Sequence, residues 1–78
     1  MNALEDIAEA REALSAGHNH DAARVIRRAM LETLDPVLLD EIHELADKGK
    51  EGAGRLRKRL VWEDILNQIE IRQRKPQG

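Results

Sequence analysis

Apolar residues recur every three or four positions through most of this 78-residue chain, and this spacing limits the fold more than any other feature. Ala3, Ile7, Ala10 and Leu14 are the first example. Residues spaced in this way line one face of an α-helix, whereas a strand would need strict alternation. The apolar residues are mostly Leu, Ile and Ala, and aromatic residues make up 1% of the chain. We therefore expect an all-α protein with three to four helices.

The first two helices are predicted on either side of a short connection. Asn2 stands three residues before Glu5, which is the spacing of a capping box, and the first helix follows it. Gly17 suits the left-handed conformation that ends many helices, and the second helix is expected from about Asp21 to Leu34. Because the connection between these amphipathic helices is short, the sequence predicts an N-terminal antiparallel hairpin.

A short third helix and a linker are predicted next. Asp35 followed by Pro36 is typical of a helix start, with a capping side chain and then proline at the first helical position. The apolar spacing of this helix ends at Ala46. Residues 47–54, with the sequence DKGKEGAG, contain three glycines and show no apolar rhythm. We expect this Gly-rich segment to be a flexible linker.

The last helix is predicted from about Arg55 to Arg74, and it is apolar on two sides. Most of its apolar residues share one stripe, but Leu56, Leu60 and Ile71 project to nearly the opposite side. A helix that is apolar on two sides generally has two neighbours. The second neighbour is either another copy of the chain, giving a homodimer, or the chain's own core, if the first turn folds back at the glycines. The predicted partner-binding residues are Trp62, Ile65, Leu66, Ile69, Leu56 and Leu60.

Charge divides the chain into two unlike parts. Residues 1–47 carry 11 acidic and 4 basic side chains, whereas residues 48–78 carry 4 acidic and 9 basic ones. Basic side chains of the second part are expected to steer an acidic protein partner or, as the alternative, to contact nucleic acid. No aromatic side chains that would stack on bases accompany them. These candidate contacts are Arg55, Arg57, Lys58, Arg59, Arg72 and Arg74.

Residues suited to catalysis or metal binding are few. The chain has no cysteine, which excludes disulfides, thiol nucleophiles and Cys-based zinc sites. His18 and His20 lie in the predicted turn beside Asp21 and are candidate metal ligands, but adjacent residues of one short turn rarely supply three ligands. No phosphate-binding glycine loop of a known spacing is present. We expect a non-enzymatic protein with no metal and no cofactor.

The N-terminal half resembles one helical hairpin of the tetratricopeptide-repeat family. Gly17, Ala22, Ile26 and Ala29 follow at steps of five, four and three residues, and Ala10 fills the small position of the preceding helix. The resemblance covers residues 3–36, and no second copy follows at the period of the family. It implies a helical hairpin that recognises another protein.

Size and hydropathy set the remaining expectations. A chain of 78 residues makes one small helical domain, here taken as residues 1–78 with a disordered tail at 75–78. No apolar run approaches the roughly 20 residues that cross a bilayer, and the first ten residues lack the pattern of a secretion signal. We therefore expect a soluble, cytoplasmic protein with no membrane partner.

Overall fold

The computed structural model describes the backbone of residues 2–54 and 56–74, and the side chains of residues 2–54 and 59–74. The described residues form four helices and no strand, so the all-α prediction is confirmed. The predicted tail at 75–78 lies outside the described residues. The helices are α1 (Ala3–Ser15), α2 (Asn19–Glu32), α3 (Pro36–Ala53) and α4 (Leu56–Gln73).

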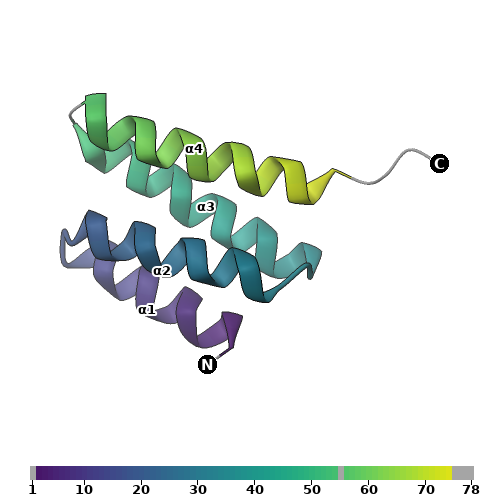
Figure 1. Ribbon diagram of the computed structural model, residues 1–78. Coiled ribbons are helices and arrows are strands. Elements are labelled where there is room, and N and C mark those ends of the chain that lie inside the picture. Colours follow the sequence, from purple (N-terminus) through teal and green to yellow (C-terminus); the bar gives the residue numbers. More distant parts are fainter. Residues whose placement is uncertain (1, 55, 75–78) are drawn as a thin grey trace.

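The four helices form two antiparallel pairs that stack on each other (Figure 1). α1 packs along α2, and α3 packs along α4. The pairs meet where α3 contacts both α1 and α2, and where α2 contacts α4. α2 and α4 run in the same direction, so their C-terminal ends lie at the same end of the molecule (Figure 1). The Cα atoms of this arrangement span 40 × 27 × 15 Å.

Capping side chains start two of the helices, as their sequences predict. The Asn2 Oδ1 atom accepts a hydrogen bond from the Glu5 backbone N–H at 2.9 Å, which begins α1. Asp35 Oδ1 accepts one from the Val37 N–H at 2.9 Å, and Pro36 occupies the first turn of α3. Gly17, with φ of 80°, turns the chain between α1 and α2. Each cap satisfies an N–H group that has no partner within its own helix.

The prediction of a flexible linker at residues 47–54 is wrong, because most of this segment is helical. α3 continues through Ala53 and ends at Gly54, whose φ of 67° is in the left-handed region. The predicted start of the second helix is also corrected, since α2 begins at Asn19 and ends at Glu32. Because α3 extends through Ala53, it is as long as α4, and each of these two helices has 18 residues.

Gly49 explains why a glycine-containing segment continues α3. The side chain of Trp62, which is 1% exposed, lies directly over the Gly49 backbone. A Cβ atom added at Gly49 would stand 2.4 Å from two carbons of the indole ring. The indole occupies the place that a side chain would take, so α3 and α4 approach closely here. The glycine that favours a linker in the sequence is a packing position in the fold.

The core of the domain runs through all four helices. Trp62 and large aliphatic side chains of α2, α3 and α4 fill its centre, and three alanines of α2 allow close helix approach. Burial of such side chains is the main favourable contribution to folding in a chain of this size. The core residues are Ile7, Ala10, Ala22, Ala23, Val25, Ile26, Ala29, Met30, Leu39, Ile42, Leu45, Ala46, Ala53, Trp62, Ile65, Leu66 and Ile69.

Two glycines of α3 provide a matched test of this packing. Gly49→Ala places a methyl group 2.4 Å from two carbons of the Trp62 indole, and we expect a net loss of about 1–2 kcal/mol in the free energy of unfolding, since overpacking outweighs the gain in helix propensity. Gly52→Ala meets only Asn19 Nδ2 at 3.6 Å, so it should leave stability unchanged or raise it by up to about 1 kcal/mol. Urea unfolding of both variants measures the difference. Equal stabilities would contradict the packing described.

Candidate interaction surface

Four of the six residues predicted to bind a partner belong to the core instead. Trp62, Ile65, Leu66 and Ile69 are buried within the chain. Their stripe packs against the chain's own helices, because α3 extends far enough to cover it. These side chains are therefore not available to a partner in this fold. The Leu56 side chain lies outside the described residues.

The opposite side of α4 is open. Leu60 and Ile71 are 53% and 56% exposed, and they project away from the buried stripe. Leu60 therefore does not fold back onto the core. Asp64 and Asn67 lie between the two apolar side chains on the same side of the helix, and both are exposed. We call these four residues the outer face of α4.

The structure describes the side chains of three of the six basic residues predicted to contact a partner. The side chains of Arg55, Arg57 and Lys58 lie outside the described residues, whereas Arg59 and Arg74 are exposed. Arg72 has a structural contact, since its Nε donates a hydrogen bond to the Met30 carbonyl oxygen at 3.2 Å. This bond satisfies a carbonyl near the C-terminal end of α2.

The three histidines do not form a metal site among the described residues. His18 immediately precedes α2 and His20 lies in its first turn, and both are exposed. Within residues 2–54 and 59–74, no group of three His, Asp or Glu side chains is arranged to hold a metal ion. His43 instead lies between two carboxylates, with Nδ1 3.3 Å from Asp47 Oδ2 and Nε2 3.8 Å from Glu70 Oε1. This histidine therefore lies between α3 and α4.

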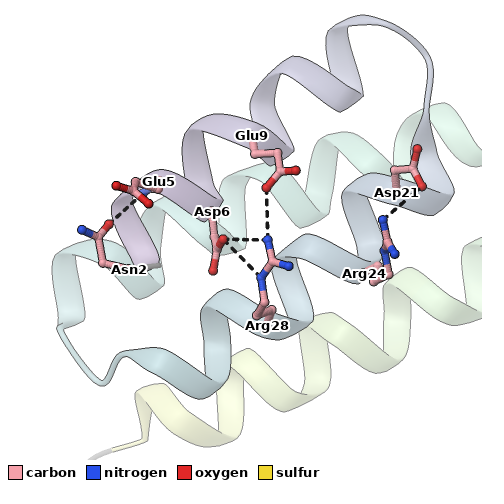
Figure 2. Close-up of polar contacts among 7 residues, drawn as sticks. All are labelled: Asn2, Glu5, Asp6, Glu9, Asp21, Arg24 and Arg28. Atoms are coloured by element: carbon pink, nitrogen blue, oxygen red, sulfur yellow. Dashed lines mark hydrogen bonds and ion pairs between the residues drawn. The ribbon is translucent and has the colours of Figure 1, made fainter.

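A buried carboxylate joins α1 to α2. Asp6 is fully buried, and Arg28 donates to its Oδ1 from Nε at 3.2 Å and from Nη2 at 2.8 Å. The same guanidinium reaches Glu9 Oε2 at 3.1 Å, so one arginine of α2 holds two acids of α1 (Figure 2). Asp6 Oδ2 has no hydrogen-bond partner among the described residues. The arrangement ties the first helix pair together.

The charges of this cluster shift one another's pKa values. The hydrogen bond from Arg28 lowers the pKa of Asp6, against the opposing effect of burial. The same bond to Asp6 raises the pKa of Arg28. Burial, followed by the neighbouring Asp6 carboxyl, raises the pKa of Glu32. Asp6 is therefore held as a carboxylate by its arginine, and the cluster acts as a structural ion pair.

A second surface follows the line where α2 and α4 lie side by side. The Arg27 guanidinium meets Asp64 Oδ2 at 3.4 Å near the middle of this line, and the Arg72 bond to Met30 closes its C-terminal part. Hollows flank these two contacts at either end, and we call the whole strip the α2–α4 seam. The first hollow is lined by Asn19, His20, Ala23, Val61 and Trp62, and the second by Met30, Leu31, Glu32, Thr33, Leu34 and Arg72.

Sequence reasoning missed the two most exposed apolar residues of this seam. Leu31 and Leu34 are 77% and 76% exposed. Leu31 lies on the side of α2 opposite the Ala22, Ile26 and Ala29 face, and that mismatch with the amphipathic pattern is the signal that could have identified it. Exposed leucines grouped around one hollow are typical of a surface that binds another molecule.

Comparison with known proteins leaves the function open. No protein-family model, no curated protein and no solved structure matches this chain. None of the helices within the described residues is long and apolar enough to span a membrane. The function proposed below therefore rests on the geometry and charge of the chain itself.

Two arginines of α2 allow a matched test of the buried pair. Arg28→Gln leaves the buried Asp6 carboxylate without its cation, so we expect a clear loss of thermal stability at pH 7. Arg24→Gln removes only an exposed pair, with Asp21 at 3.7 Å (Figure 2), and such pairs contribute about 0–1 kcal/mol. Thermal unfolding followed by circular dichroism compares the two variants. Equal losses would contradict the role given to Asp6.

The same pair predicts a pH dependence. Because the pKa of Asp6 is lowered in the folded chain, its stabilising contribution is complete above the unfolded-state pKa of about 4. The contribution is lost as the pH falls through the lower folded-state value. The stability difference between wild type and Arg28→Gln should therefore be largest near neutral pH and shrink in acid. A constant difference would show that Arg28 acts through packing alone.

Proposed function

We propose that this protein is a non-enzymatic protein-interaction module that acts through its helical surface as a homodimer. The observation that carries the proposal is the outer face of α4, where Leu60 and Ile71 remain exposed after the chain has filled its own core. A chain of this size has a small core, so covering further apolar surface in an interface adds stability that the monomer lacks.

The spacing of the outer face of α4 suits a second copy. Leu60, Asp64, Asn67 and Ile71 follow at steps of four, three and four residues, a pattern that is the same in both directions. A two-fold interface needs such self-complementarity, because the same surface is used by both chains and every contact between two residues therefore occurs twice. In an antiparallel pairing, Leu60 lies opposite Ile71 of the second copy and Asp64 lies opposite Asn67. The Asn67 amide then donates a hydrogen bond to the carboxylate.

Sedimentation equilibrium over a wide concentration range tests the homodimer. We expect association of the wild type, and we expect Leu60→Glu/Ile71→Glu to raise the dissociation constant at least about tenfold, since four added carboxylates would join the two of Asp64 in the interface. Leu4→Glu is the control, because Leu4 is an exposed leucine of α1. A wild type that remains monomeric at every concentration would overturn the homodimer.

Nucleic-acid binding is the alternative function, and the exposed Arg59 and Arg74 favour it. Neither has a carboxylate within 4.0 Å in the part of the chain that the structure describes. Titration of labelled duplex and single-stranded oligonucleotides at low and physiological salt tests it. Saturable binding that weakens steeply with salt, and that is reduced in Arg59→Ala/Arg74→Ala, would replace the protein-interaction proposal.

A further inference from the structure

We propose that Asp6 and Glu32 bind one proton between them, and that this proton fastens the C-terminal end of α2 to α1. The inference goes beyond the proposed interaction function, which rests on the outer face of α4. The ligand is the hydrogen ion, and the site is a pair of carboxyl groups in which Glu32 donates a hydrogen bond and Asp6 Oδ2 accepts it.

The buried Oδ2 atom of Asp6 is the observation that calls for a donor. Both hydrogen bonds from Arg28 end on Oδ1 of this carboxylate, at 3.2 and 2.8 Å (Figure 2). Oδ2 has no partner in the part of the chain that the structure describes, although the Asp6 side chain is 0% exposed. A buried acceptor without a donor is unfavourable, so we expect a donor within its reach.

Glu32 is placed to supply that donor. It lies four residues after Arg28, one turn further along the same side of α2, so both side chains face α1. Its carboxyl group lies within hydrogen-bonding reach of the Asp6 carboxyl. Two ionised carboxylates have no hydrogen to share, so this bond exists only when one of the two acids is protonated.

The excess of acids over cations also favours a proton. Asp6, Glu9 and Glu32 share the positive charge of Arg28, whose guanidinium reaches Glu9 Oε2 at 3.1 Å. A metal ion does not fit the surplus negative charge, because no three acids within residues 2–54 and 59–74 are arranged to hold one. Uptake of a proton reduces the repulsion and supplies the missing donor in one step.

The other helices add little charge at this pair. On α4, Arg72 lines a hollow together with Glu32, but its Nε already donates to the Met30 carbonyl oxygen. On α3, no cation of the described residues lies within 4.0 Å of Asp6 or Glu32. The α-amino group of Met1 lies outside the described residues.

The proton belongs to Glu32 rather than to Asp6. The hydrogen bond from Arg28 lowers the pKa of Asp6, whereas burial and then the Asp6 carboxyl raise the pKa of Glu32. The pair therefore holds one proton at every pH between these two pKa values. In that range Arg28 keeps its bonds to Oδ1 and Glu32 donates to Oδ2, so both oxygens of the buried carboxylate have partners.

Mild acid is therefore expected to strengthen the contact. Because the pKa of Glu32 is raised in the folded chain, its contribution is complete below the unfolded-state pKa of about 4.3 and is lost as the pH rises through the folded-state value. Asp6 has the opposite dependence, since its contribution is lost only as the pH falls through its own lowered pKa. The end of α2 is held most firmly between the two.

Carbon-13 NMR of the side-chain carboxyl groups tests the pair in the wild type. We expect Glu32 to titrate above, and Asp6 below, their unfolded-state pKa values of about 4.3 and 3.9. Each signal should also respond at the midpoint of the other, since the two groups share a proton. Titration of Glu32 at its unfolded-state value, or independent titration of the two acids, would overturn the inference.

Glu32→Gln replaces the proton-dependent donor with a permanent one, because an amide donates at every pH. We expect Tm at pH 7 and at one protein concentration to rise by roughly 2–4 °C, and the gain to shrink as the pH falls toward 4. Glu9→Gln is the matched control, since it removes an acid that pairs with the same arginine and should bring no gain. Absence of a gain in Glu32→Gln, or a gain that is constant with pH, would contradict the shared proton.

A third variant separates the pair from the effect of the helix end. A carboxylate at the C-terminal end of α2 is also disfavoured by the helix dipole, and this effect does not need Asp6. In the Asp6→Ala background, Glu32→Gln should therefore bring at most about half of its gain. An equal gain in both backgrounds would overturn the inference and assign the pH dependence to the helix end. If Asp6→Ala does not fold, the titration of the wild type decides.

Discussion

The contact between Trp62 and the bare backbone of Gly49 determines how the second half of this chain folds. The indole is the largest buried side chain, and it fits because Gly49 has no Cβ. The close approach lets α3 continue to Ala53 alongside α4. Because α3 is long, it covers the apolar stripe of α4 from within the same chain. The apolar side chains on the outer face of α4 consequently remain exposed.

Much of the fold was predictable from local patterns, and the parts that were not depend on contacts between distant residues. The helical class follows from apolar spacing, and the caps at Asn2 and Asp35 follow from residues only two or three positions away. The role of Gly49 could not be predicted in this way, since glycine inside a polar segment favours a turn until Trp62 is placed over it. Burial of that tryptophan likewise removed it from the predicted partner contacts.

Apolar packing holds both helix pairs together, and each pair has polar contacts of its own in addition. In α1 and α2 the polar contact is the buried carboxylate with its arginine, whereas in α3 and α4 bridging pairs such as Lys50 with Glu63 at 3.4 Å accompany the close packing of Trp62 on Gly49. α2 and α4 meet through the Arg27–Asp64 ion pair and the hydrogen bond from Arg72 to Met30, and hollows remain at each end of this line.

Amide hydrogen exchange in residues 49–53 tests the central claim most directly. These residues are the glycine-containing end of α3, and their backbone N–H groups lie in the helix in this structure. If Trp62 over Gly49 holds the segment in place, its amides will exchange with protection close to that of Ile42 and Leu45 in the core of the same helix. Exchange at the rate of an unstructured peptide, with the rest of α3 protected, would show that the segment is a linker and contradict the account.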